Sequence, residues 1–205
     1  MTTTLETRII KLEINAATLD DLLAGAALAA HSKADLPTLN AVRLALTDGV
    51  LTATATDRYR LFHGVSNDLF TDNVDNGFEI LIPLNFAKAI RSNLKPRIGR
   101  VSRPITVEIE GDFIRLVTIE GTWNYRGVSG NFPPFAQLLT DTYYPMDAVS
   151  LNPKLLADMA KVPGLDKNIP LVLRSTGEKK ALIAQVNTNR VNWKLLLMPM
   201  RTPNA

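Results

Sequence analysis

The residue types that carry enzyme and metal chemistry are scarce in this sequence. Its 205 residues include no cysteine and two histidines, His31 and His63. The lack of cysteine excludes thiol catalysis, disulfides, cysteine-ligated zinc and iron–sulfur clusters, and two histidines leave little for a multi-histidine metal site. Asp72, Asn73 and Asp75 share one polar stretch but lack the spacing and closing glutamate of an EF-hand. We therefore expect no metal and no cofactor.

Motifs for catalysis are also missing. The chain has no G-x-G-x-x-G, no Walker loop and no G-x-S-x-G. The neighbouring carboxylates Asp20 and Asp21 are better explained as the first turn of a helix capped by Thr18, where the helix dipole favours acidic side chains. A small hydrolase that uses the Asp72–Asp75 loop is an alternative, but no nucleophile–base pair supports it. The sequence thus predicts a protein that is not an enzyme.

Basic side chains are concentrated in one part of the chain. The formal net charge is only +3, but residues 80–107 contain no Asp or Glu. Lys88, Arg91 and Lys95 have the i, i+3, i+7 spacing of one helix side, and Lys154 and Lys161 are also seven apart on a later predicted helix. Such faces suit non-specific contact with nucleic-acid phosphates, and an ordinary solvated lysine face is the alternative. The candidate nucleic-acid contacts are Lys88, Arg91, Lys95, Arg97, Arg100, Lys154 and Lys161.

Alternating apolar residues and turn signals predict a chain of many short strands with three helices. Strands are expected over 8–14, 39–46, 50–56, 59–65, 78–82, 104–110, 113–120, 122–128, 148–151, 170–174, 180–186 and 191–198, with a polar loop over 67–77. Helices are expected over 18–30, 84–94 and 153–161; Asn152 caps the last of these, with Pro153 at its first position. Gly25, inside the first helix, indicates close packing.

These elements follow one another as three βαβββ units, over residues 7–66, 77–129 and 147–201. Antiparallel strands with a helix on one face predict an α+β layer fold.

Three short segments carry a more specific signal. They are Leu36–Leu61, which ends in A-T-D-R-Y-R-L, Gly130–Leu139, which reads G-N-F-P-P-F-A-Q-L-L, and Leu195–Arg201, which reads L-L-L-M-P-M-R. Together they resemble the bacterial replicative sliding clamp, the β subunit of DNA polymerase III. In that family A-T-D-x-x-R-L ends a strand of the middle domain, G-x-[FY]-P links the middle and last domains, and M-P-M-R closes the chain. All three occur here in the family's order.

The resemblance implies a fold and a domain arrangement. The fold is the sliding-clamp (DNA clamp) fold, with antiparallel sheets outside and helices on one face. Residues 1–139 resemble a complete clamp domain of two βαβββ units, with a linker from about residue 130, and residues 140–205 resemble a half domain that ends in the M-P-M-R motif.

The resemblance also implies a function. Sliding clamps are non-catalytic rings whose inner helices contact duplex DNA non-specifically, and they dock short peptides of polymerases and repair proteins in an apolar pocket. Carried over by position, this partner-peptide pocket comprises Leu39, Thr56, Arg58, Tyr59, Arg60, Leu61, Pro133, Leu138, Leu196, Met198, Pro199 and Met200. Methionine suits such a wall because its side chain repacks around varied anchors. The alternative for Leu196 and Met198 is an ordinary place in the core of an edge strand.

The chain departs from the family at several pocket positions. Arg58 and Tyr59 stand where small and histidine residues are usual, and Gln137 stands where a basic residue is common. Residues 202–205 follow Arg201, whereas the family's chain ends with a single leucine after this arginine. These differences predict a pocket that is narrower or is tuned to another peptide, with Arg58 favouring acidic peptides.

The length makes assembly a central question. A clamp ring of this family contains twelve βαβββ units, so three per chain would need four chains. A lone half domain also exposes an apolar sheet face or edge. We therefore expect a homo-oligomer, either a dimer or a tetrameric ring, with half domains pairing across a twofold axis.

Location and an alternative function complete these expectations. The chain has no long apolar segment and no secretory signal, so we expect a cytoplasmic, nucleoid-associated protein without a membrane partner. The alternative function is a clamp-derived peptide-binding module, a decoy, regulator or self-resistance protein, that does not encircle DNA.

Overall fold

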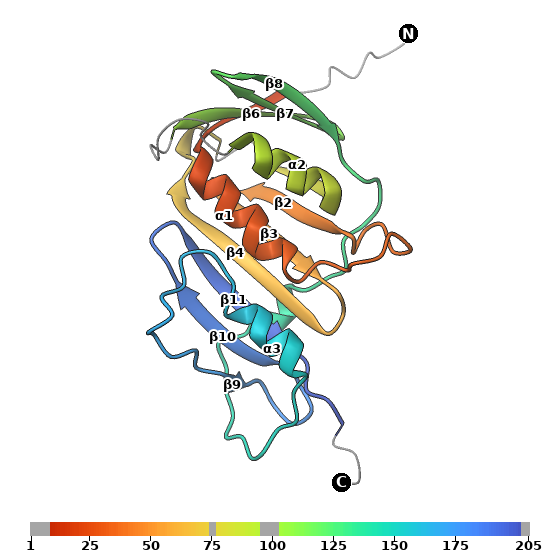
Figure 1. Cartoon of the computed structure of the whole chain (residues 1–205), viewed down its shortest axis with the longest axis vertical. Helices are drawn as coiled ribbons and strands as arrows, with labels where there is room; N and C mark the ends of the chain where they lie inside the picture. The colour runs from red at the N-terminus through yellow and green to blue at the C-terminus, as the bar shows by residue number, and fades with distance from the viewer. Residues whose placement is uncertain (1–8, 74–76, 95–102, 202–205) are drawn as a thin grey trace.

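The computed structural model describes residues 9–73, 77–94 and 103–201 (Figure 1). The first unit contains β1 (Ile9–Asn15), α1 (Ala16–Ala27), β2 (Ala41–Thr47), β3 (Val50–Thr56) and β4 (Arg60–Leu69). After a 3-10 turn, η1 (Thr71–Asn73), the second unit contains β5 (Phe78–Pro83), α2 (Leu84–Leu94), β6 (Pro104–Glu110), β7 (Phe113–Thr118) and β8 (Gly121–Arg126). The remainder contains η2 (Ala136–Leu138), α3 (Pro153–Met159), β9 (Arg174–Ser175), β10 (Leu182–Asn187) and β11 (Val191–Leu197).

The first two units exchange their first strands. Strand β1 pairs with β6 of the second unit, and β5 pairs with β2 of the first, both antiparallel. The strand orders are β1-β6-β7-β8 in one sheet and β5-β2-β3-β4-β11-β10-β9 in the other. Each of these two units therefore completes the sheet of the other, and the longer sheet continues into the third unit where β4 pairs with β11.

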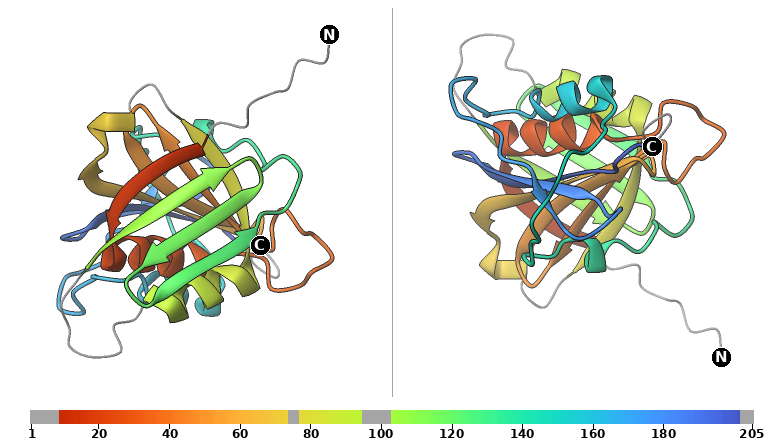
Figure 2. Two further views of the ribbon diagram at one scale, coloured as in Figure 1. Left: turned by 90° about the horizontal axis from the view of Figure 1, so that it is seen from above. Right: turned by 90° about the horizontal axis from the view of Figure 1, so that it is seen from below.

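The three helices lie together on one side of the molecule, and the sheets form the opposite side (Figure 2). One large apolar core is formed by the inner faces of both sheets with α1 and α2, and Met159 of α3 joins it. The expected α+β architecture, with antiparallel sheets outside and helices on one face, is confirmed.

The helix caps were predicted correctly in one case of two. Asn152 caps α3 by accepting the Lys154 N–H at 3.0 Å, and Pro153 is the first helical residue, as expected. Helix α1, however, begins at Ala16 and not near Thr18, because Asn15 Oδ1 accepts the Ala17 N–H at 2.8 Å. The helix ends at Ala27 and not at residue 30.

Asp20 and Asp21 consequently lie in the second turn of α1, and the helix dipole does not explain them. Asp20 Oδ1 pairs with Arg91 Nε of α2 at 2.7 Å. Asp21 Oδ2 pairs with Arg190 Nε, in the turn before β11, at 2.6 Å. These carboxylates fasten α1 to its neighbours on both sides.

The third unit departs from the predicted pattern at two strands. Residues 148–151 form no strand, and the strand predicted over 170–174 is reduced to Arg174–Ser175. In the other two units, the first strand of each pairs with the second strand of the other, as β1 does with β6 and β5 does with β2. The described part of this chain offers the third unit no such partner, which explains both differences. A smaller correction concerns β4, which extends to Leu69, into the predicted loop, because Leu69 pairs with Val50.

Trp193 of β11 joins the third unit to the first. Its side chain is 1% exposed and lies between Gly25 of α1 and Gly64 of β4. A Cβ placed on Gly25 would lie 2.3 Å from the indole, and one on Gly64 would lie 2.6 Å from it. Such distances are shorter than any van der Waals contact, so only glycine leaves room for the ring. The prediction that Gly25 indicates close packing is confirmed.

Candidate peptide site and nucleic-acid interface

Two of the motif segments meet where β4 pairs with β11. Leu61 lies directly opposite Leu196 in this pairing. Beyond the end of β11, the Met198 N–H donates to the Tyr59 carbonyl oxygen at 2.8 Å, so the pairing extends toward the M-P-M-R segment. The sheet therefore brings the A-T-D-R-Y-R-L and M-P-M-R motifs together, although about 140 residues separate them along the chain.

The turn that leads into β4 is fixed by side-chain hydrogen bonds. Thr56 Oγ1 donates to the Arg60 carbonyl oxygen at 2.6 Å and accepts the Arg58 N–H at 3.1 Å. Asp57 Oδ1 accepts the N–H groups of Tyr59 and Arg60, each at 3.0 Å. Arg58 has a φ of +78° and an exposed side chain. The Thr-Asp pair of the motif thus holds a tight turn that presents Arg58 and Tyr59 to solvent.

One face of this junction is apolar and is covered by the linker. Leu61, Leu196, Ile183 and Ala181 form a buried cluster. The partly buried linker residues Phe135, Leu139 and Tyr143 pack against it. Leu61 and Leu196 are accordingly only 5% and 2% exposed. A ligand reaches these two leucines only if the linker side chains move aside.

The twelve candidate pocket residues fall into groups by exposure. Four are buried: Leu39, Thr56, Leu61 and Leu196. Arg60 and Pro199 are half-buried, and six are exposed: Arg58, Tyr59, Pro133, Leu138, Met198 and Met200. The exposed apolar members at the junction, Tyr59 and Met198, are the ones that a docking peptide would meet first.

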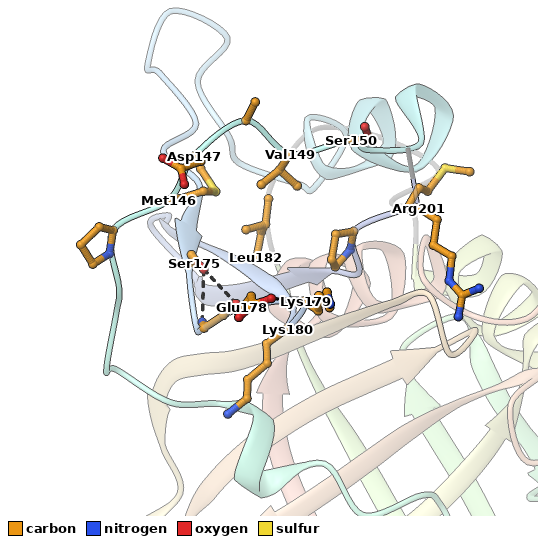
Figure 3. Close-up of a pocket in the computed structure, with 15 residues that line it drawn as sticks. Met146, Asp147, Val149, Ser150, Ser175, Glu178, Lys179, Lys180, Leu182 and Arg201 are labelled. Atoms are coloured by element: carbon orange, nitrogen blue, oxygen red, sulfur yellow. Dashed lines mark hydrogen bonds and ion pairs between the residues drawn. The ribbon is translucent and has the colours of Figure 1, made fainter. Parts of the chain in front are cut away.

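Pro199 and Met200 line a different hollow, of about 890 Å³, on the third unit (Figure 3). Its walls are residues 145–150, the hairpin between β9 and β10, and the M-P-M-R segment. The Met200 N–H donates to the Ser150 carbonyl oxygen at 2.8 Å, which holds two of these walls together. The structure therefore does not gather all twelve residues into one pocket.

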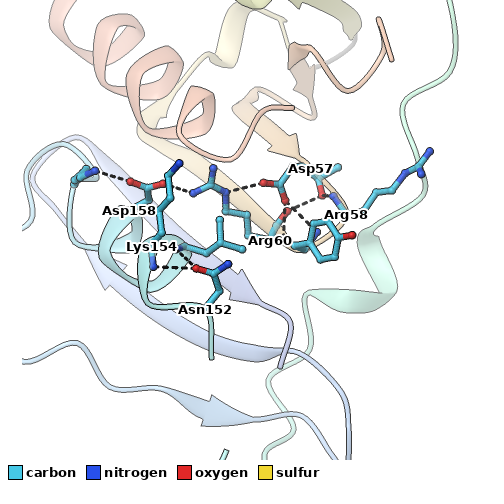
Figure 4. Close-up of polar contacts among 10 residues, drawn as sticks. Asp57, Arg58, Arg60, Asn152, Lys154 and Asp158 are labelled. Carbon is cyan, nitrogen blue, oxygen red and sulfur yellow. Dashed lines mark hydrogen bonds and ion pairs between the residues drawn. The ribbon is translucent and has the colours of Figure 1, made fainter. Parts of the chain in front are cut away.

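The opposite face of the junction carries an ion-pair network (Figure 4). Arg60 Nε pairs with Asp57 at 3.0 Å, and Arg60 Nη1 contacts Asp158 of α3. Lys161 Nζ pairs with the other Asp158 oxygen at 2.6 Å. Burial raises the pKa of Asp158, but hydrogen bonds from Lys161 and Arg60 outweigh it, so the net pKa lies below its usual value. The network fastens α3 to the start of β4.

Sequence reasoning placed Arg60 in the pocket and missed this network. Arg60 and Asp158 lie 98 residues apart, and no local spacing connects them. One signal was available in the sequence. Asp158 lies four residues after Lys154, so the two charged side chains share a face of the predicted helix, and Asp158 could have been expected to pair with a cation.

The candidate DNA contacts divide in a similar way. Lys88 of α2 and Lys154 of α3 have exposed side chains, and both helices belong to the helical side of the molecule (Figure 2). Arg91 and Lys161 are engaged in ion pairs with Asp20 and Asp158, as described above. Lys95, Arg97 and Arg100 lie outside the described residues. On the described helices, Lys88 and Lys154 are thus the cations most available to bind a polyanion.

His63 lies on the apolar face of the junction, two residues after Leu61. Its ring centroid is 5.6 Å from that of Phe135, and its Nδ1 is 2.8 Å from Thr54 Oγ1. Burial, followed by the positive charges of Arg43 and Lys194, lowers the pKa of His63 to about 4. The ring is therefore neutral beneath the linker at neutral pH.

This lowered pKa predicts a pH-dependent stability. Between pH 6.5 and pH 4 the unfolded chain binds a proton at His63 that the folded chain does not, so stability falls as the pH drops through this window. We expect the His63→Gln variant to lose about 2 kcal/mol less than the parent between pH 7 and pH 4.5. Urea unfolding at a series of pH values measures this, and parallel pH curves for the two proteins would contradict it. His31→Gln is the control.

Metal and membrane features are absent within the described ranges. No group of three or more His, Asp or Glu side chains in residues 9–73, 77–94 and 103–201 could hold a metal ion, and Asp75 lies outside these ranges. Among the helices described, none combines the length and apolarity needed to cross a bilayer.

Comparison with known proteins identifies the fold. No protein-family model and no curated protein sequence matches the chain. Among solved structures, it is similar to the β subunit of DNA polymerase III from Thermotoga maritima, with a TM-score of 0.77 and 16% identity over 99% of this chain and 68% of that one. The DNA polymerase β subunit of Streptococcus pyogenes gives a TM-score of 0.76 and 16% identity, over 98% of this chain and 68% of that one.

A sliding clamp from Pseudomonas aeruginosa, bound to griselimycin, gives a TM-score of 0.75 and 15% identity over 98% of this chain and 68% of that one. The chain therefore has the sliding-clamp fold and spans about 68% of the length of these clamp chains. The fold inferred from the three motifs is confirmed at a sequence identity that by itself would be uninformative.

Proposed function

We propose that this protein is a non-catalytic, sliding-clamp-like processivity factor that contacts duplex DNA through its helical side and docks polymerase or repair peptides at the β4–β11 junction. The observation that carries the proposal is the match of almost the whole chain to clamp β subunits. On this proposal the protein works in the cytoplasm at the nucleoid, as a homo-oligomer.

The helical side supports contact with the DNA backbone. α1, α2 and α3 lie on one side of the molecule (Figure 2), as the lining of a ring would require. The acidic residues Asp20 and Asp21 on this side are neutralised by Arg91 and Arg190. Lys88 and Lys154 remain exposed, so the described part of this side carries two positive charges that phosphates could contact. Such a surface suits phosphate contact that is independent of sequence and weakened by salt.

The junction supports peptide docking. The exposed side chains of Tyr59 and Met198, which are 66% and 38% exposed, provide apolar area near the exposed cation of Arg58. A short peptide with hydrophobic anchors and an acidic residue complements these groups. The buried leucines beneath the linker would deepen the site when Phe135 moves.

Retention on circular DNA tests the clamp role. We expect the protein, loaded on nicked circular DNA, to remain bound at a salt concentration that removes simple electrostatic binders, and to be lost when the circle is cut. Retention that is equal on linear and circular DNA would contradict the ring and leave only surface binding.

Charge reversal at Lys88 tests the DNA-facing side. We expect Lys88→Glu to weaken DNA binding and to reduce the slope of log K against log salt by about 1, because one phosphate contact is lost. Lys179→Glu is the matched control, since Lys179 is an exposed lysine on the hairpin between β9 and β10, outside the three helices, and its substitution changes the net charge equally. Equal effects of the two substitutions would show that Lys88 makes no specific contact.

A clamp-derived peptide-binding module that does not encircle DNA is the second candidate. It is favoured because Arg91 and Lys161, two of the candidate DNA contacts, are engaged in ion pairs, whereas the β4–β11 junction is present.

Peptide titration tests the docking site common to both candidates. We expect Met198→Ala to weaken binding of a synthetic clamp-binding peptide about tenfold, a loss of about 1.4 kcal/mol, because the exposed thioether would pack on the peptide. Met146→Ala is the control, since Met146 is 44% exposed in the separate hollow on the third unit. Unchanged affinity of the Met198 variant would remove the docking assignment from this position. Peptide binding without retention on circles would identify the module.

A further inference from the structure

We propose that a second copy of this chain completes the third unit by strand exchange, so that residues 148–152 of each copy pair with residues 170–174 of the other. This deepens the self-association included in the proposed function, but the argument comes from the chain's own geometry and does not depend on DNA. The contact would be a closed, twofold interface between identical surfaces.

The first two units show what a completed unit looks like. In each, the first strand ends at the residue before the helix, which is Asn15 before α1 and Pro83 before α2. Asn15 lies opposite Pro104 of the other unit, and Pro83 lies opposite Ala41. The exchange is therefore reciprocal, and both halves share one register.

The third unit contains segments that correspond to both partners of this pairing, a first strand and a second strand. Asn152 is the residue before α3, so residues 148–152 correspond to the end of a first strand. Ser175 lies opposite Leu182 just before the β9–β10 turn, as Leu46 lies opposite Leu51 in the first unit. Counting back five residues from Leu46 gives Ala41, and counting back five from Ser175 gives Pro170. The shared register thus pairs Asn152 of one copy with Pro170 of the other.

Burial shows what the third unit lacks. One and three residues before Asn15 are Ile14 and Leu12, which are 2% and 1% exposed. The equivalent residues before Asn152 are Leu151, which is half-buried, and Val149, which is 38% exposed. The same apolar pattern is therefore present in residues 148–152, but its side chains are less covered: Leu151 packs only in part against the main core, and Val149 is exposed.

The hollow of about 890 Å³ lies in the place of the missing layer. Val149 and Leu182 both line it. Leu51, the first-unit counterpart of Leu182, belongs to the main core that Leu12 and Ile14 help to fill from the other sheet. A second copy would supply the equivalent layer here, because it brings its own Val149 and Leu151.

The acceptor edge is open along most of its length. Residues 170–173 form no strand, and within the described residues only Tyr144 bridges to this edge, at Ser175, with its N–H donating to the Ser175 carbonyl oxygen at 3.0 Å. The five proposed pairs end at Arg174 and leave that bridge intact. A second copy is the occupant that the structure favours, because each copy has both a donor segment and an acceptor edge in matching register.

Mass in solution is the first test. Light scattering at tens of micromolar should give twice 22.5 kDa or a multiple of it for the parent protein. Val149→Asp should shift the protein to 22.5 kDa. Residue 149 is exposed in the monomer, so an aspartate is tolerated there, but the exchange would bury its charge and is therefore prevented. Ile119→Asp, at a position that is 81% exposed, is the matched control and should not change the mass. A parent protein of 22.5 kDa at these concentrations would overturn the proposal.

Crosslinking tests the register without depending on a destabilising change. Lys11 and Glu108 are opposite each other in the first exchange, and their side chains touch at 2.9 Å. Their third-unit counterparts are Ala148 and Arg174. Because the chain has no cysteine, Ala148→Cys and Arg174→Cys give one thiol each, and a mixture of the two should form a disulfide-linked heterodimer on mild oxidation.

The control mixture pairs Ala148→Cys with Ile169→Cys, which lies five residues, or about 17 Å of strand, from position 174. Equal crosslinking in both mixtures would overturn the register. The outcomes separate this inference from the clamp role. If the Val149→Asp variant has the same oligomer mass as the parent, the exchange alone is refuted. If an exchanged dimer forms but is not retained on circular DNA, the ring alone is refuted.

Discussion

Trp193→Ala should lower the free energy of unfolding by about 4 kcal/mol, the largest single loss that we expect in this chain. The indole is 1% exposed and fills the space between Gly25 of α1 and Gly64 of β4. Its removal leaves a cavity between α1, β4 and β11, and the two glycines that face it have no side chains to fill it. Urea denaturation followed by far-ultraviolet circular dichroism measures the loss.

Two further variants identify the cause. Trp193→Phe should cost much less than alanine, because a ring remains and because the indole Nε1 has no hydrogen-bond partner among the described residues. Gly25→Ala should also be destabilising, because its methyl group would lie 2.3 Å from the indole. In the double variant Gly25→Ala with Trp193→Ala, the glycine change should cost little. Additive losses would show that the two sites do not share this contact.

Arg60→Ala should cost about 3 kcal/mol and should loosen α3 from the sheet. The Arg60 side chain is 11% exposed and lies between Asp57 and Asp158, which are 13% and 14% exposed. Its loss leaves two carboxylates close together and only partly solvated, and Lys161 can compensate only Asp158. Hydrogen exchange should accelerate in residues 153–159 more than in β6 or β7.

Arg115→Ala is the matched control for this prediction. Arg115 also pairs with a carboxylate, Glu108, at 3.1 Å, but its own side chain is 45% exposed. Its loss should cost less than about 1 kcal/mol, as for an ordinary surface ion pair. A similar cost for the two arginines would mean that the Arg60 network is no more than a surface feature.

Local signals predicted most of the secondary structure, because the hairpins and helices are encoded by nearby residues. Asp48-Gly49, with φ values of +50° and +74°, forms the tight turn that its sequence indicates. The second helix was predicted with the bounds that the structure has, over 84–94. The prediction of a strand over 148–151 is wrong because this strand depends on distant residues. A strand needs a partner strand, and no local pattern shows whether one is present.

The candidate sites were harder to predict, because they depend on contacts between distant segments. The motifs located the β4–β11 junction, but they did not show that Phe135 and Leu139 of the linker cover its leucines. They also gave no sign that Arg91 is held by Asp20, since the helical spacing of Lys88 and Arg91 indicates a shared face and says nothing of the neighbouring helix. The domain boundary near residue 139 and the roles of the twelve pocket residues stay predictions.

The exchanged strands also set the order in which a chain emerging from the ribosome can fold. Strand β1 is synthesised well before β6, the strand that it pairs with among the described residues, because β6 begins at Pro104. Strand β4 must wait still longer for β11, which begins at Val191. Contacts of such long sequence separation slow folding and keep apolar edges exposed during synthesis. We therefore expect a nascent chain that stops short of residue 110 to leave β1 without its full partner strand, and Trp193 of β11 to be buried only after residues 191–197 have been synthesised.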